Sequence, residues 1–284
     1  MFNVCSLVIE HFVVELEEAY RQTYGQIRPE VGEIIAWIGR LALENIANSD
    51  ALYHNVEHTI MVALVGQAIL KGRHLREGNV TPEDWLHYMI AVLCHDIGYV
   101  KGICRADDRR TNTFATGIGD QVVTLPADGT DIALTPYHVD RGKLFVRERF
   151  GNRQIVGTDI QVDVERVATY IEVTRFPAPD DPLHQDTSGY AGLVRAADFI
   201  GQLGDPNYLR KIPALFYEFE ENDTNVETGY RSPGDMRRQF AGFYWNVVRH
   251  YVQPALEYLR LTQEGKLWIA NLYSHIFEIE HPEV

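Results

Sequence analysis

Cysteine is scarce in this sequence, and its spacing excludes two classes of site. Only three cysteines occur among 284 residues, Cys5, Cys94 and Cys104, and none belongs to a CxxC pair. Neither a disulfide framework nor a zinc site built from thiolates is therefore expected. Cys94 lies inside an apolar run, where we expect it to be a small core residue.

Basic residues are outnumbered by acidic ones. The chain has 26 Lys and Arg against 40 Asp and Glu, which gives a formal net charge of −14. This balance argues against broad nucleic-acid binding through a basic surface and makes anionic membranes poor partners. An anionic substrate would need local cations to offset the field of the acidic residues.

Long apolar runs and a targeting segment are also missing. No apolar run approaches the roughly 20 residues that a membrane span needs. The start, residues 1–5, has no basic residue of the kind found at the beginning of a signal peptide. These features predict a cytoplasmic location. The hydrophobic content of 45% is typical of a globular protein, and we expect one domain over residues 1–284, with homo-oligomer formation left open.

Apolar residues recur at helical spacing along most of the chain, without an internal repeat or a convincing run of strands. Helices are predicted over residues 4–24, 31–46, 53–70, 81–96, 136–150, 162–175, 188–203, 207–221, 236–261 and 263–279. Pro254 should kink or interrupt one of the last two helices. The prediction is an all-α fold, a compact multi-helix bundle. Its C-terminal helices, at about residues 207–280, are expected to pack on the helices before them.

The segment of residues 103–136 has no sustained period and is rich in Thr, Gly, Asp and Asn. Loops of this length are uncommon inside compact domains and are often functional. A lid over a site and a surface insertion both fit this composition.

Two histidines mark the start of the most apolar predicted helix. His54 and His58 are four residues apart, so a helix would place both side chains on one face. No charged residue occurs between Glu57 and Lys71, which predicts a buried helix. The N-cap is expected within residues 48–50. Either histidine alone would be read as a hydrogen-bonded core residue, whereas the two together could reach one site.

Two carboxylates occupy unfavourable places in the predicted helices. Asp96 follows His95 at a helix C-terminus, where the macrodipole destabilises an acid by about 0.3–1 kcal/mol. Asp198 lies inside an apolar helical stretch, where it would either pair with Arg195 one turn earlier or bind a cation. Imidazoles and carboxylates that converge in the protein interior predict a binding site for Zn, Mn, Fe or Mg.

The order of these residues resembles that of the HD-domain superfamily of metal-dependent phosphohydrolases. The resemblance covers about residues 50–204 and implies that this part of the chain forms the metal-binding core. The segment of residues 53–58, with the sequence YHNVEH, resembles the YHNxxH segment of cyclic-nucleotide phosphodiesterase catalytic domains. The resemblance implies that the first metal is bound by His58, His95, Asp96 and Asp198. It also implies that Asp96 bridges to a second metal if one is present, and that His54 is the general acid that protonates the leaving oxygen.

The sequence departs from that family at one position and leaves two further candidates. The phosphodiesterases typically carry HDxxH, but Tyr99 stands where the second histidine is expected. Lys101 is a candidate contact to the substrate phosphate or, alternatively, a solvated lysine at a helix end. His138 is placed where some HD-domain proteins have another histidine near the second metal.

The resemblance and the chemistry of these residues predict a metal-dependent phosphohydrolase that uses one or two divalent ions and metal-activated water. Its partner would be a small phosphorylated substrate, such as a nucleotide or a cyclic nucleotide. The alternatives are a di-iron oxygenase of the same fold, which would need further histidine ligands, and a non-catalytic nucleotide-sensing module.

Overall fold

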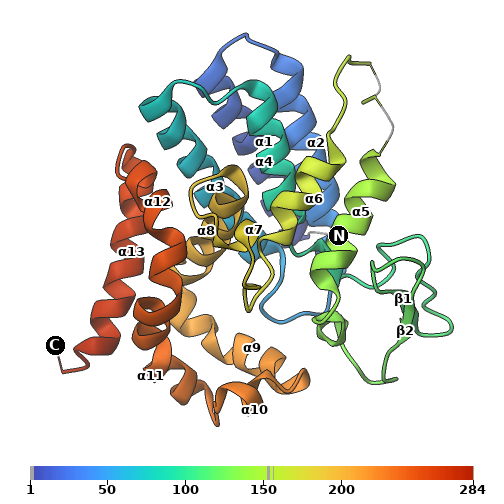
Figure 1. The fold of residues 1–284 in the computed structure, drawn as a ribbon, viewed down its shortest axis with the longest axis vertical. Helices are drawn as coiled ribbons and strands as arrows, with labels where there is room; N and C mark the ends of the chain where they lie inside the picture. The colour runs from blue at the N-terminus through green and yellow to red at the C-terminus, as the bar shows by residue number, and fades with distance from the viewer. Residues whose placement is uncertain (1–2, 152–153, 156, 284) are drawn as a thin grey trace.

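Helices form nearly all the regular structure of the computed structural model, which describes residues 3–151, 154–155 and 157–283 (Figure 1). Residues 1 and 2, on which the expectation about a signal peptide partly rests, lie outside this description. The helices are α1 (Val4–Tyr24), α2 (Pro29–Ile46), α3 (Val56–Glu77), α4 (Pro82–Cys94), α5 (His138–Phe150), α6 (Val164–Glu172), α7 (Pro182–Gln185), α8 (Tyr190–Leu203), α9 (Tyr208–Glu221), α10 (Thr224–Thr228), α11 (Pro233–Phe243), α12 (Arg249–Leu259) and α13 (Gln263–Glu280). The all-α prediction is confirmed. Among the described residues, no helix is long and apolar enough to cross a bilayer.

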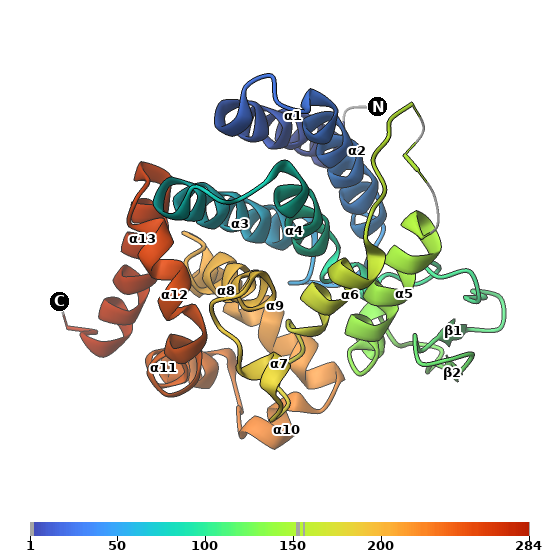
Figure 2. The ribbon, with the colours of Figure 1, turned by 45° about the horizontal axis from the view of Figure 1, so that its top comes forward.

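The centre of the molecule is built from α3, α4 and α8. Figure 2 shows α3 and α4 between the α1 and α2 pair on one side and α8 on the other, while α12 packs on α3 and α8. At Gly201 the backbones approach so closely that a Cβ atom there would lie 2.7 Å from the Val62 Cα. Glycine at this position therefore allows α8 to bring its side chains, Asp198 included, next to those of α3.

The start of α3 differs from the prediction. Asn55 is the N-cap, because its side chain accepts hydrogen bonds from the backbone N–H groups of Glu57 (2.9 Å) and His58 (3.3 Å). The N-cap expected within residues 48–50 is therefore wrong. His54 precedes the helix, so the prediction that His54 and His58 share one helical face is also wrong.

The start of α4 follows its local signals closely. Thr81 and Asp84 form a reciprocal capping box, and Pro82 occupies the first turn. The helix ends at Cys94, and a short 3₁₀ turn, η1 (Ile97–Tyr99), follows it. Within this turn a Cβ atom on Gly98 would lie 1.8 Å from the His138 carbonyl oxygen, so glycine permits the close approach of α5.

The segment of residues 103–136 contains a small hairpin beside α5 (Figure 1). Its antiparallel strands are β1 (Thr113–Ala115) and β2 (Val122–Thr124), and a 3₁₀ turn, η2 (Asp131–Leu134), follows. The sequence analysis found no sustained period in this segment, since strands of three residues are too short to show a clear period of two.

One buried arginine fixes this segment to the rest of the fold. Arg141 of α5 is 0% exposed and forms an ion pair with Asp107, in which Nη1 and Nη2 lie 3.0 and 2.9 Å from the two carboxylate oxygens. It also donates to the carbonyl oxygens of Gly98 (2.7 Å), Val100 (2.9 Å) and Ala115 (2.5 Å). The guanidinium therefore joins η1, the hairpin and α5.

Replacing Arg141 with Met should lower the free energy of unfolding by about 3–5 kcal/mol, because the buried Asp107 carboxylate loses its counter-ion. Urea denaturation measures this loss. The matched control is Arg147→Met, whose ion pair with Glu165 is exposed and should contribute less than about 1 kcal/mol. Equal losses in the two variants would contradict the role given to Arg141.

His87 should make folding sensitive to acid. Its Nδ1–H donates to the Glu83 carbonyl oxygen (2.7 Å), and its Nε2 accepts the Asp163 backbone N–H (2.8 Å), so the folded state holds a neutral imidazole. Burial lowers the pKa of His87. Because His87 takes up a proton at about pH 6.5 in the unfolded chain but not in the folded chain, stability should fall as the pH drops below that value.

The measurement is the free energy of unfolding at pH 7 and pH 5. His87→Gln should show a smaller decrease than the wild type, whereas the exposed His11→Gln control should show the full decrease. An unchanged decrease in His87→Gln would exclude this contribution.

The C-terminal helices also depart from expectation in one place. The α-helical pattern is interrupted between α11 and α12 by a π-helical turn at Tyr244–Val248. The helix α12 continues through Pro254, so the interruption predicted at that proline is wrong, whereas a kink there stays a prediction.

Candidate metal centre

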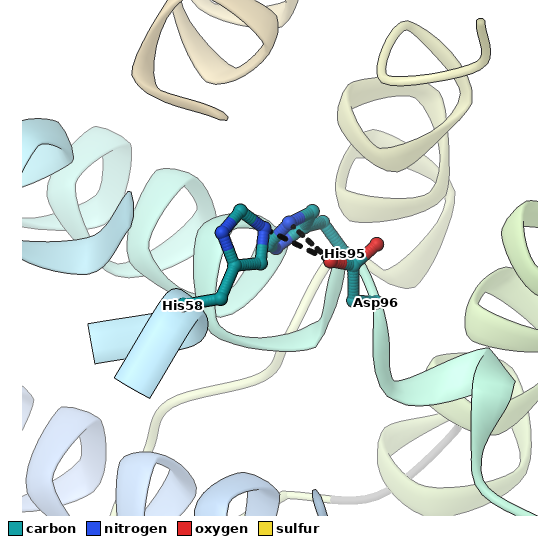
Figure 3. Close-up of side chains that lie close together, drawn as sticks. All are labelled: His58, His95 and Asp96. Atoms are coloured by element: carbon teal, nitrogen blue, oxygen red, sulfur yellow. Dashed lines mark ion pairs between the residues drawn. The ribbon is translucent and has the colours of Figure 1, made fainter. Parts of the chain in front are cut away.

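Three predicted ligands converge where the start of α3 meets the end of α4 (Figure 3). His58 Nε2 lies 3.2 Å from Asp96 Oδ2, and His95 Nε2 lies 3.0 Å from the same oxygen. All three residues are buried, and their ligand atoms lie within 4.8 Å of one another. This group could hold a metal ion.

Asp198 reaches the same group from α8. Its Oδ1 lies 3.4 Å from His58 Nε2 and 3.6 Å from His95 Nε2. Arg195, its alternative partner, instead donates to the Asp186 carbonyl oxygen (3.2 Å). The fold therefore brings together the four residues His58, His95, Asp96 and Asp198, although their role as ligands stays a prediction.

The hydrogen bonds around His95 leave a gap that a cation would fill. Its Nδ1–H donates to the Val92 carbonyl oxygen (2.8 Å), so in the neutral imidazole Nε2 directs a lone pair towards Asp96. Among the described residues, His95 Nε2 and Asp96 Oδ2 have no hydrogen-bond partner, although both are buried. Buried polar groups normally have one. A proton or a metal ion between His95 Nε2 and Asp96 Oδ2 would give both atoms a partner and remove the repulsion between their lone pairs.

The close approach of the imidazoles and carboxylates also shifts the pKa values of the cluster. Burial alone would raise the pKa of Asp96, but the charge of the neighbouring His95 and the close approach of His58 hold that pKa well below its usual value. Burial alone would lower the pKa of His95, but Asp96 and Asp198 raise it well above its usual value. Burial alone would raise the pKa of Asp198, but the neighbouring His58 and His95 lower it. The cluster therefore favours ionised carboxylates with positive charge between them.

His54 is held beside this cluster by an acid that the sequence analysis did not identify. Its Nδ1–H donates to Glu218 Oε2 (2.5 Å), while Glu218 Oε1 accepts the backbone N–H groups of Tyr53 (2.6 Å) and His54 (3.2 Å). Glu218 is a buried residue of α9, flanked by Tyr217 and Phe219. An acid within an apolar helical stretch, the signal that revealed Asp198, could have identified it.

Glu218 sets both the protonation and the orientation of His54. Burial alone would lower the pKa of His54, but the Glu218 carboxylate raises it to about 9. Because Nδ1 is bound to Glu218, Nε2 is the nitrogen that gains or loses the proton. His54 therefore carries a proton at neutral pH and can release it from Nε2.

Tyr99 fills the space between two histidine rings. It stacks on His54 with ring centroids 4.8 Å apart and on His138 with centroids 4.3 Å apart. His138 Nδ1–H donates to the Thr135 carbonyl oxygen (2.6 Å), and burial lowers the pKa of His138. Among the described residues, no hydrogen bond or ion pair joins His138 to the four clustered side chains. Its role at a second metal stays a prediction.

Lys101 is engaged away from the cluster. Its Nζ donates to the Gly129 carbonyl oxygen (2.6 Å) and lies 3.9 Å from Asp131 Oδ1. The structure thus gives this lysine partners within the segment of residues 103–136, and its predicted contact with a substrate phosphate gains no support from these partners.

Comparison with protein families places the chain beside a described family. A family model described as Npun_R2479-like matches residues 2–282 of the chain. No curated protein sequence matches it.

Proposed function

The chain belongs to the Npun_R2479-like family, and we propose that this member is a metal-dependent phosphohydrolase. The observation that carries the proposal is the buried group of His58, His95 and Asp96, with Asp198 beside it and unpaired lone pairs facing one another. A protonated histidine, His54, stands at the edge of this group.

The four clustered side chains would hold the first metal ion. Two imidazole nitrogens and two carboxylates suit Zn, Mn or Fe, and the carboxylates also admit Mg. A divalent ion held there would supply a Lewis acid for the phosphoryl oxygens and a water of lowered pKa. Asp96 would be the bridging ligand if a second ion binds.

His54 would donate the proton that the leaving oxygen needs. Its side chain is 16% exposed and that of Asp198 is 23% exposed, whereas those of His58 and His95 are 3% and 1% exposed. A substrate would therefore approach from the side of His54 and Asp198. Glu218 fixes the ring so that Nε2 remains available, which is the arrangement that general acid catalysis requires.

The proposed substrate is a small phosphate ester. The formal charge of −14 opposes anion binding over most of the surface, so the metal ion would supply the local positive charge. The resemblance of residues 53–58 to the phosphodiesterase segment makes nucleotides and cyclic nucleotides the first substrates to test.

The test is an activity screen of chelator-treated protein loaded separately with Mg, Mn, Fe or Zn. The substrates are nucleotides, cyclic nucleotides, p-nitrophenyl phosphate and bis(p-nitrophenyl) phosphate. We expect ester hydrolysis that depends on added metal. A chain that hydrolyses none of them with any metal would exclude the proposal, and turnover only with iron and oxygen would identify an oxygenase instead.

A further inference from the structure

Arg195 of α8 is a buried cation with few partners. The residue is 1% exposed, its Nη2 donates to the Asp186 carbonyl oxygen (3.2 Å), and its guanidinium lies 3.9 Å from the centre of the Tyr251 ring. Within residues 3–151, 154–155 and 157–283, Nε and Nη1 have no hydrogen-bond partner, and no carboxylate forms an ion pair with this guanidinium.

A comparison with Arg141, which is also fully buried, shows which contacts Arg195 lacks. Arg141 binds the Asp107 carboxylate and three carbonyl oxygens, so its charge and its donors are satisfied. Arg195 remains charged at any physiological pH, and a buried charge is normally paired. Three of its five N–H donors, those on Nε and Nη1, therefore still need an acceptor.

The guanidinium lies beside the first turn of α8. The Asp186 carbonyl oxygen that it binds packs against Gly192, where an added Cβ atom would lie 2.5 Å from that oxygen. The N-cap, Gly189, offers no side-chain acceptor to the helix. In the described structure, the backbone N–H groups of residues 190–192 have no assigned acceptor, while the Asp186 carboxylate accepts from Ser188 and Gly189. The Arg195 guanidinium and the free N–H groups of the first turn therefore lie at the same end of α8, beside the Asp186 carboxylate.

We propose that Arg195 and the first turn of α8 form a binding site for a small oxyanion, with a phosphate group as its ligand. Tyr251 covers one face of the guanidinium. A guanidinium binds phosphate oxygens through the N–H groups along its edge, and those on Nε and Nη1 are the buried donors without a partner. Helix N-termini bind phosphate through their free amides and the helix dipole. The site is separate from the metal cluster but lies on the helix that carries Asp198, one turn away, and it does not depend on the proposed hydrolase activity.

The experiment is a calorimetric titration of chelator-treated, full-length protein with inorganic phosphate, with melting temperature as a second measurement. The wild type should bind phosphate and melt at a higher temperature in its presence. Arg195→Met should lose at least about tenfold in affinity, since hydrogen bonds to a charged group are lost. The control His58→Ala should bind phosphate like the wild type, because the metal cluster is not part of this site.

Phenyl phosphate, titrated in parallel, distinguishes an esterified phosphate group from the free ion by which ligand binds more tightly. A wild type that binds neither ligand would overturn the proposal and leave water as the partner of Arg195. Equal binding by Arg195→Met would also overturn it. If Arg195→Met does not fold, Arg195→Lys decides: weaker binding supports the site, and unchanged binding contradicts it.

Discussion

Replacing Asp96 with Asn is expected to remove both the bound divalent metal and the hydrolysis of phosphate esters. Asp96 Oδ2 lies within 3.2 Å of Nε2 of both His58 and His95, so the same charged oxygen lies next to both histidines of the candidate centre. Asn keeps the volume but loses that charge. Because a metal ion supplies several kcal/mol of transition-state stabilisation, we expect activity to fall by roughly a thousandfold or more.

Elemental analysis and phosphate-release assays on the same preparations measure the two effects. The matched control is Asp131→Asn, because Asp131 is a buried acid that lies near Lys101 rather than in the cluster. That variant should keep its metal. An Asp96→Asn protein that retains full metal occupancy would show that the ion binds elsewhere.

Replacing His54 with Gln should leave the metal in place and reduce turnover by about 10²–10⁴-fold, the range typical for loss of a general acid. His54 contacts Glu218 through Nδ1, and no ion pair joins it to Asp96 or Asp198. Its contribution should therefore be a proton at Nε2 and not a bond to the metal. Metal content and kcat, measured together, separate these two roles.

The pH profile adds an independent check through Glu218. A general acid works only when protonated, so activity should fall as the pH rises through the pKa of His54, which Glu218 raises to about 9. Glu218→Gln should shift this alkaline limb to lower pH. The control Glu221→Gln changes an exposed acid on the same helix that binds Thr130 and should leave the limb unchanged.

For the His54→Gln variant, loss of the bound metal would show that the division of roles between His54 and the metal ligands is wrong.

The parts of the fold that depend on local signals could be predicted from the sequence. The helix predicted over residues 4–24 has the bounds of α1, and the helix predicted over residues 81–96 starts within one residue of α4. The acids Asp96 and Asp198 in unfavourable helical positions pointed to the cluster. A buried charge needs a partner, even where the sequence does not show which residue provides it.

The errors arose where two local signals competed or where the contact was distant. Asn55 caps α3 and excludes His54 from the helix, although residues 48–50 contain equally good capping side chains. Glu218 meets His54 from 164 residues away, and periodicity alone does not reveal which helix faces which. Tyr99, visible only as a departure from a family pattern, proved to be the ring stacked between His54 and His138.

The most direct test of the metal centre is anomalous scattering from crystals of manganese-loaded or zinc-loaded protein. The account predicts an anomalous peak within about 2.0–2.2 Å of Nε2 of both His58 and His95 and of carboxylate oxygens of Asp96 and Asp198. A fully loaded crystal with its peak elsewhere, or with no peak among these four side chains, would contradict it.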